Sequence, residues 1–233
     1  MNIGLFGYGK MGKMIEKIAI QRNHSIIARA DVDTKEIDFT SMDMAIDFSS
    51  PEAAFTNIKN CLENNVPVIS GTTGWLKDYD KVISLCKEKN GAFIYASNFS
   101  LGVNLFFELN CYLAKMMGNL HQYKVSIEET HHLQKLDAPS GTAITLAESI
   151  IENSDYEGWQ MEKSRDQHVP IISKRIANEY GTHVVSYESL VDEIVIKHKA
   201  HNRQGFALGA IVAAEWLNGK EGVFTMKDVL NLG

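Results

Sequence analysis

Over the first hundred residues, short apolar runs alternate with segments whose apolar residues recur at helical spacing. In the first helical segment Met11, Ile15 and Ile18 fall on one face, as in a helix that packs on a core. Ser50 and Pro51 suit the N-cap and first position of the next helix. The expected strands are residues 2–6, 25–30, 44–48, 66–70 and 92–96, and the expected helices run from residue 11, from 51 to about 64 and from 76 to 89. Strands that alternate with helices predict a parallel sheet with helices on both faces.

After residue 99 the pattern changes. Residues 123–130 alternate apolar and polar side chains, which is typical of a strand with one wet face. Residues 153–167 are polar, and we expect an exposed connection there. The other expected elements are helices at 101–117, 140–152 and 205–217 and strands at 182–187 and 193–198. The fold class is therefore α/β, with a second, α+β domain around a mixed or antiparallel sheet, and the last helix is expected to pack on the first domain.

Composition restricts the class of protein. The 233 residues are 45% hydrophobic, enough for one large domain or two small ones. A net charge of −6 argues against affinity for nucleic acid or anionic membranes. The apolar stretch 206–214 is too short to span a bilayer, and the N-terminus has no export signal. Because Cys61, Cys86 and Cys111 are widely spaced, neither a disulfide framework nor a zinc knuckle is expected. We expect a cytoplasmic protein.

A glycine motif, Gly7-Tyr8-Gly9-Lys10-Met11-Gly12, follows the first expected strand and opens the first helix. In such a turn the first glycine permits the bend, the second lets backbone approach a pyrophosphate, and the third lets helix and strand pack closely. Asp31 ends the second expected strand, where a carboxylate would bond the ribose hydroxyls. The spacing predicts dinucleotide binding; the alternative is a structural glycine turn.

The choice of cofactor stays open between NADH and NADPH. Asp31 would repel a 2′-phosphate and so favours NADH, but Arg29 and Lys35 are close enough in sequence to weaken that preference. Asp33 is a second candidate for the ribose, or a turn residue. A further ligand loop is expected at Gly71-Thr72-Thr73-Gly74, since loops at the carboxyl edge of a parallel sheet bind ligands; a plain connection is the alternative.

The densest polar segment runs from residue 129 to 142. It holds His131, His132 and Lys135, and a helix then begins near Ser140. Free amides at a helix start, with cations beside them, suit a small anionic substrate. Three plainer interpretations compete: a capped helix after a loop, a structural role for one histidine because neighbours on a strand point oppositely, and a zinc site. Since HExxH and cysteine ligands are lacking, no metal is expected.

At these residues the sequence resembles the dihydrodipicolinate reductase family of bacterial lysine and diaminopimelate synthesis. The likeness covers essentially the whole chain, and residues 129–143 are close to a family signature. Two features depart from the family pattern: the glycine turn is shorter, and residues 178–181 lack the usual R-x-G arrangement, which puts a role for Arg175 in doubt. The other motifs that carry the resemblance are residues 46–49, 71–74, 96–104, 198–200 and 206–207.

The resemblance implies a Rossmann domain from residues 1–100 and 203–233, and a substrate-binding, tetramerising domain from 101–202. It implies NAD(P)H-dependent reduction of 4-hydroxy-tetrahydrodipicolinate by a cytoplasmic homotetramer. By motif position, His131 and Lys135 become the catalytic pair. The implied substrate ligands are His132, Ser140, Gly141 and Thr142, and the implied nicotinamide pocket is Gly71, Thr72, Thr73, Ala96, Ser97, Asn98 and Phe99.

The implied substrate is a cyclic imine dicarboxylate that loses its hydroxyl as water before hydride adds at ring C4. Lys135 is the expected general acid, and His131 either orients or delivers the proton. The role of Arg203 stays open. Three other functions compete: another nicotinamide oxidoreductase, a semialdehyde dehydrogenase, and a nucleotide-sensing regulator. The second needs a cysteine in an electropositive setting and the third a basic surface, and the sequence has neither feature.

Overall fold

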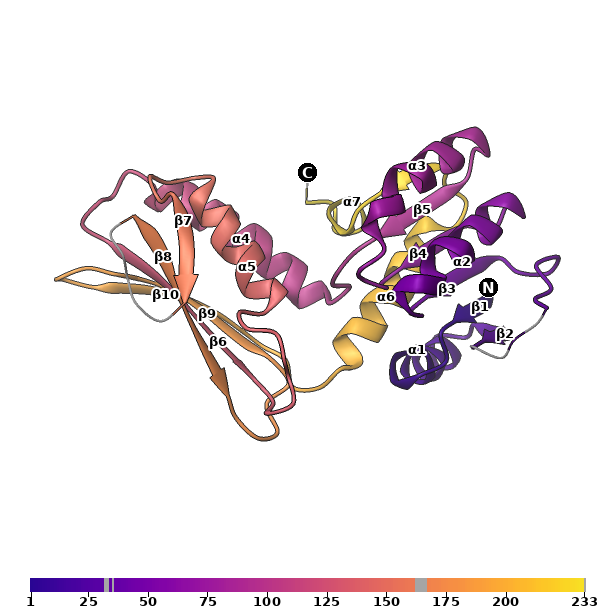
Figure 1. The fold of residues 1–233 in the computed structure, drawn as a ribbon, viewed down its shortest axis with the longest axis horizontal. Coiled ribbons are helices and arrows are strands. Elements are labelled where there is room, and N and C mark those ends of the chain that lie inside the picture. The colour runs from indigo at the N-terminus through magenta and orange to yellow at the C-terminus, as the bar shows by residue number, and fades with distance from the viewer. Residues whose placement is uncertain (32–33, 35, 162–166, 233) are drawn as a thin grey trace. The chain divides into compact units, whose positions relative to one another are not determined.

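A computed structural model describes residues 1–31, 34, 36–161 and 167–232 (Figure 1). The chain forms two compact units. The first combines residues 1–101 with the chain from Gln204 onward, and the second is the continuous stretch Gly102–Arg203. None of the helices in the described ranges is long and apolar enough to cross a membrane.

The first unit is built on a six-stranded sheet in which every neighbouring pair is parallel. Its order is β11-β5-β4-β3-β1-β2. The chain adds β2 on one side of β1 and then adds β3, β4 and β5 on the other side, so the order in which strands are added reverses between β1 and β3. The strands are β1 (Asn2–Phe6), β2 (Ser25–Ala30), β3 (Met44–Asp47), β4 (Val68–Ser70), β5 (Ala92–Tyr95) and β11 (Gly222–Phe224). The predicted parallel α/β domain is confirmed.

Two apolar clusters lie on the two faces of this sheet. Side chains of α1 (Lys10–Gln21) and α6 (Gln204–Leu217) pack with alternate strand residues such as Leu5 and Ile46. Side chains of α2 (Pro51–Glu63) and α3 (Tyr79–Glu88) pack with the intervening ones, such as Phe6 and Ala45. The remaining helices here are the 3-10 turn η1 (Leu76–Asp78) and α7 (Met226–Leu230). As predicted, the late apolar helix α6 packs in this core.

The second unit has a mixed five-stranded sheet of order β10-β9-β6-β8-β7. β6 is parallel to β8 and antiparallel to β9, which confirms the predicted mixed sheet. The helices α4 and α5 pack on one face of it (Figure 1). The elements are α4 (Leu101–Met117), β6 (Lys124–His131), α5 (Gly141–Ile151), β7 (Gly158–Met161), β8 (His168–Arg175), β9 (Thr182–Glu188) and β10 (Glu193–Lys199).

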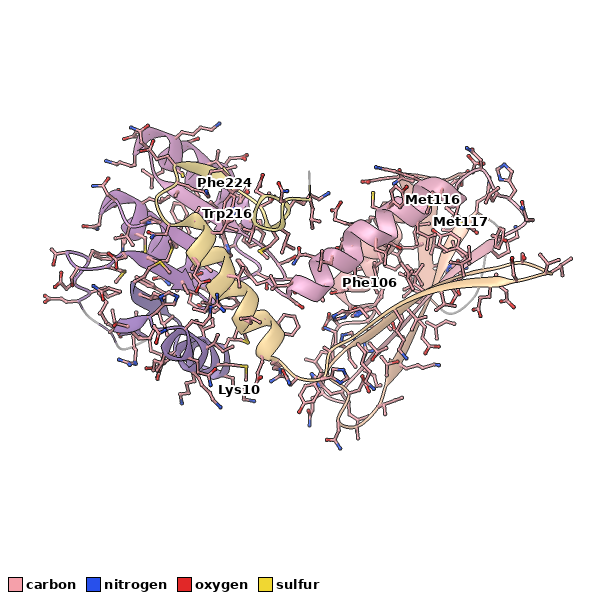
Figure 2. The ribbon with its side chains drawn as sticks, turned by 180° about the vertical axis from the view of Figure 1, so that it is seen from behind. Lys10, Phe106, Met116, Met117, Trp216 and Phe224 are labelled. Atoms are coloured by element: carbon pink, nitrogen blue, oxygen red, sulfur yellow. The ribbon has the colours of Figure 1, made fainter. Side chains whose placement is uncertain are left out.

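The prediction of an exposed connection over residues 153–167 is wrong in part. β7 lies within it and pairs in parallel with β8, which was also not predicted. Residues 162–166 of that stretch lie outside the described residues. Two further elements were not predicted: β11, only three residues long, and the five-residue α7. Phe224 of β11 packs edge-on against Trp216 of α6, with ring centres 5.1 Å apart. Both residues are labelled in Figure 2.

Candidate active site

The glycine motif lies at the point where the strand order reverses, which is where ligands bind in such sheets. Gly7 has a φ of +89°, and a Cβ there would stand 2.1 Å from the carbonyl oxygen of Phe48. A Cβ on Gly12 would stand 2.3 Å from the Gly7 oxygen. Around Gly9, the N-cap of α1, a Cβ would meet nothing within 4 Å. Two glycines are therefore required by packing, whereas Gly9 borders open space.

The other residues of the motif have different surroundings. The hydroxyl of Tyr8 donates to the carboxylate of Glu16. The guanidinium of Arg29 donates to the same carboxylate and lies 5.7 Å from the centre of the Tyr8 ring. Lys10 is exposed at the start of α1 (Figure 2), and Met11 packs at the edge of the core. Glu16, whose charge neutralises Arg29, was not among the predicted site residues.

Asp31 follows β2 directly and is exposed. Its backbone N–H donates to Thr34 Oγ1 at 2.9 Å, and the Thr34 N–H donates to the Asp31 carbonyl at 2.9 Å. These bonds fix a turn at the strand end beside the glycine motif, since Gly7 N–H donates to Ala30 O at 2.8 Å. The alternative ribose ligand Asp33, and Lys35, lie outside the described residues.

The loops after β4 and β5 are neighbours because the two strands pair. Thr72 is buried, and its hydroxyl donates to Asp47 Oδ2 at 2.7 Å, so its side chain anchors the 71–74 loop. Phe99 is also buried, with its ring 5.8 Å from that of Phe48. Thr73 and Ser97 are exposed, while Ala96 and Asn98 are half-buried. Within the two predicted loops, some residues thus stabilise the loop itself and others face outward.

Asp47, the last residue of β3, accepts hydrogen bonds from several side chains at the carboxyl end of the sheet. In the sequence it was noted only as part of a motif. Its carboxylate is fully buried. Burial raises the pKa of Asp47, and the donors around it act in the opposite direction. These donors are Ser49 Oγ at 2.6 Å, Asn57 Nδ2 at 3.1 Å, Ser70 Oγ at 2.8 Å and Thr72 Oγ1 at 2.7 Å.

In the second unit, His131 is the last residue of β6 and is buried. Its Nδ1 is hydrogen-bonded to the carboxylate of Glu129, two residues earlier on the same face of the strand. Burial alone would raise the pKa of Glu129, but the hydrogen bonds from His131 and Arg175 outweigh burial and hold it at about 2. Glu129 is therefore an anion that fixes the orientation of the His131 ring.

His183 is the third residue of this cluster and its second imidazole. The His183 ring lies edge-on to that of His131, with ring centres 5.1 Å apart. Burial, followed by the positive charge of His131, lowers the pKa of His183 to about 3, so His183 is neutral. Its Nε2 is 3.0 Å from the hydroxyl of Ser140, which also accepts from the Ala143 N–H at 3.2 Å. In the sequence His183 carried no signal that distinguished it from an ordinary histidine.

The start of α5 divides the predicted substrate ligands into two kinds. Ser140 is the N-cap and is buried, so its hydroxyl serves the helix and His183. Gly141 is exposed, with nothing within 4 Å of an added Cβ, and Thr142 is half-buried. Because the first amides of a helix have no intrahelical partner, the backbone at Gly141 and Thr142 is suited to bind a carboxylate.

Lys135 lies in the loop between β6 and α5, and its Nζ is 2.8 Å from both carboxylate oxygens of Asp137. Its positive charge is a minor cause of the lowered pKa of His183. His132 instead lines a cavity of about 250 Å³ together with Tyr180 and Arg203. The two adjacent histidines thus have different surroundings, as expected at a strand end.

A metal ion could in principle bind here, because ligand atoms of Glu129, His131 and His183 lie within 4.8 Å of one another. The Arg175 guanidinium, however, donates to Glu129 at 2.9 Å and would stand as a cation beside any metal ion. Ser140 already uses a nitrogen of His183. These contacts support a hydrogen-bonded network rather than a set of metal ligands.

Both halves of the chain match a known family. Family models described as dihydrodipicolinate reductase, N-terminus and C-terminus, match residues 1–99 and 102–230. The chain is 58% identical over 234 residues to a 4-hydroxy-tetrahydrodipicolinate reductase of Christiangramia forsetii, with 99% of this chain and 98% of the relative covered. It is 36% identical over 229 residues to the same-named enzyme of Buchnera aphidicola subsp. Schizaphis graminum, with 92% and 80% covered.

A solved structure shares the fold. Dipicolinate-bound dihydrodipicolinate reductase from Paenisporosarcina sp. matches with a TM-score of 0.81 at 22% identity, with 97% of each chain covered. With family models over both halves and a relative 58% identical over almost the full length, the chain belongs to the dihydrodipicolinate reductase family.

Proposed function

We propose that the chain reduces 4-hydroxy-tetrahydrodipicolinate to tetrahydrodipicolinate with NAD(P)H, through His131 and Lys135, in lysine and diaminopimelate biosynthesis. The observation that carries the proposal is the 58% identity to a reductase of that name over almost the full length of both chains. The enzyme class is EC 1.17.1.8.

The dinucleotide binds at the glycine motif of the first unit. The open space beside Gly9 and the free amides at the start of α1 would hold its pyrophosphate. Asp31 bonds the ribose hydroxyls, and the exposed parts of the 71–74 and 96–99 loops contact the nicotinamide. NAD(P)H, when bound, supplies the hydride.

NADH is the preferred cofactor in this proposal. A 2′-phosphate needs an unpaired cation near the ribose, and the sequence offered Arg29 and Lys35 for that role, of which Lys35 lies outside the described residues. In the structure Arg29 donates to Glu16 from two of its nitrogens. Its charge is thus already neutralised, while the exposed Asp31 repels a phosphate.

The substrate is a small dicarboxylate, and the second unit binds one of its carboxylates at the amides of Gly141 and Thr142. The Paenisporosarcina reductase was solved with dipicolinate bound, and this ligand supports a ring dicarboxylate as the class of substrate. His132 and Arg203 line one cavity, in which the Arg203 guanidinium supplies positive charge for a second anionic group.

Proton transfer follows hydride addition. Hydride at ring C4 pushes electrons toward the ring nitrogen and leaves a carbanion-like carbon that needs a proton. Lys135 Nζ donates that proton, and the exposed Asp137 carboxylate beside it connects Lys135 to solvent for reprotonation. His131, oriented by the buried Glu129, holds the substrate or delivers the proton in its place.

The assembly we propose is a cytoplasmic homotetramer formed by the second unit. Exposed apolar side chains on its edge strand β10, Ile194 and Val195, support self-association. Light scattering tests this by measuring the mass of the particle in solution, which we expect to be that of four chains.

A coupled assay tests the function. Dihydrodipicolinate synthase generates the unstable substrate, and nicotinamide absorbance is followed with NADH and NADPH in separate runs. We expect oxidation that depends on the synthase, faster with NADH. Cofactor binding without turnover would overturn the assignment of His131 and Lys135 and favour a nucleotide sensor.

A further inference from the structure

Arg175, at the end of β8, contacts both the carboxylate that holds His131 and the loop that carries Lys135. Its Nη1 donates to Glu129 Oε1 at 2.9 Å, and Glu129 in turn holds the His131 ring. Its Nη2 donates to the Asp137 carbonyl at 2.7 Å, and its Nε to the Lys135 carbonyl at 3.3 Å. One guanidinium thus connects the strand that carries His131 to the loop that carries Lys135.

The backbone register fixes this geometry. Arg175 is paired with His131 in the parallel β6–β8 ladder, and the next N–H, of Ile176, donates to the His131 carbonyl at 2.8 Å. A fourth bond runs from Arg175 Nη1 to the Lys174 carbonyl at 2.8 Å. Because the guanidinium has more N–H donors than an ammonium and holds them in a planar fork, it can donate to a carboxylate and three carbonyls at once, which the three donors of an ammonium cannot do.

We infer that Arg175 is a positioning residue for catalysis, which holds the 135–137 loop and the Glu129–His131 pair in one arrangement. The inference rests on the proposed function, since it assigns Arg175 a role through His131 and Lys135. Residues 178–181 depart from the pattern usual in the family, but the contacts of Arg175 do not depend on them.

The other hydrogen bonds of Lys135 are local to its loop. Lys135 N–H donates to the His132 carbonyl at 3.1 Å, and Lys135 Nζ bonds to Asp137 of the same loop. Both contacts are within the loop and move with it. The bonds from Arg175 instead join the loop to β8, so losing them frees Lys135 relative to His131.

The test compares Arg175→Ala and Arg175→Lys with the wild type in the coupled assay. For Arg175→Ala we expect kcat to fall about 30-fold or more, with the Kd for NADH within twofold, because the cofactor site lies in the other unit. Arg175→Lys keeps the charge beside Glu129 but cannot reach both carbonyls, so we expect about a tenfold loss. Far-UV circular dichroism and Tm are measured on each variant.

Chemical rescue supplies a readout that a merely structural residue would not move. The Arg175 side chain is 21% exposed, so a guanidinium ion can enter the space left in Arg175→Ala. We expect low-millimolar guanidinium to restore kcat about tenfold in this variant and not in Arg175→Lys or the wild type.

Lys174→Met is the matched control, since Lys174 is the neighbouring cation of β8 and pairs with exposed Glu128. We expect its kcat to stay within twofold of the wild type. A kcat within threefold of the wild type for folded Arg175→Ala would overturn the inference. If Arg175→Ala does not fold, a kcat of Arg175→Lys equal to that of the wild type would also overturn the inference. Failure of the wild type itself to turn over would instead overturn the proposed function.

Discussion

Thr72 donates its hydroxyl to the buried carboxylate of Asp47 and accepts the backbone N–H of Ser49 at 2.8 Å. The end of β3 and the loop after β4 are thereby joined through one side chain. The predicted nicotinamide loop is thus held in place before any cofactor arrives, and its shape depends on a residue outside the loop.

Replacing Asp47 by Ala removes the acceptor for four buried or half-buried donors. We expect a loss of about 2–4 kcal/mol in the free energy of unfolding, because unsatisfied buried donors keep their desolvation cost. Urea denaturation measures it, with exposed Asp80→Ala as the control. NADH affinity should fall too, since the 71–74 loop loses its anchor. An unchanged midpoint would contradict this role of Asp47.

Two glycines of the motif should respond differently to the same substitution. Gly12→Ala places a Cβ 2.3 Å from the Gly7 oxygen, so we expect a loss of about 1–3 kcal/mol in stability. Gly9→Ala meets nothing within 4 Å, so its Tm should match the wild type while NADH binds at least tenfold more weakly. Thermal unfolding and fluorescence titration separate the two effects. Equal NADH affinity in Gly9→Ala would exclude Gly9 as the pyrophosphate contact.

Lys135→Ala should leave NADH affinity nearly unchanged and lower turnover on the order of a hundredfold or more. The residue lies in the second unit and the glycine motif in the first, so cofactor binding is not expected to change. Steady-state kinetics and NADH titration on one preparation check this. Equal losses in both would argue against the general-acid role.

Cofactor preference should respond at two positions. Asp31→Ala is expected to weaken NADH more than NADPH, because the ribose hydroxyls lose their acceptor. Glu16→Gln removes the negative charge beside Arg29, so we expect KM for NADPH to fall about three- to tenfold. The ratio of kcat/KM for the two cofactors measures both effects. If Asp31→Ala leaves this ratio unchanged, the ribose role passes to Asp33.

The buried His183 should make stability depend on pH. Its pKa is about 3 in the folded protein against 6.5 for an ordinary histidine, so between these values the unfolded chain binds a proton that the folded one excludes. Stability present above about pH 6.5 is therefore lost as the pH falls toward 3, at up to about 1.4 kcal/mol per pH unit. His183→Gln should flatten this slope in urea titrations, whereas exposed His201→Gln should not.

The sequence predicted the elements whose apolar pattern is long or has clear residues at its boundaries. The 101–117 helix and the strands at 2–6 and 25–30 have the predicted bounds. β7 was not predicted because Gly158–Met161 is short and half-buried. β8 was not predicted because Pro170 interrupts its apolar run. β8 is held by its pairing with β6, and β7 by its pairing with β8, and neither pairing can be read from the local sequence pattern.

The residues of the candidate site also fall into those that the local sequence pattern indicates and those that only strand pairing brings in. Motif residues such as His131 and Lys135 could be found because they are polar and crowded in sequence. Glu129 could have been predicted as the partner of His131, since it is an acid two positions earlier on the same face of the strand. Arg175 and His183 are distant in sequence and join the cluster only through the β6–β8 and β6–β9 ladders, so no local pattern predicts them.

The sheet of the first unit takes its outer strand from the far end of the chain, since β11 pairs with β5 and α6 supplies core residues such as Ile211. During translation, residues 1–101 leave the ribosome long before residues 204–224. The second unit, continuous in sequence, can fold while the first still has an open β5 edge and an unfilled apolar face. We therefore expect the first unit to complete its sheet and core after the second unit, although most of its residues are synthesised first.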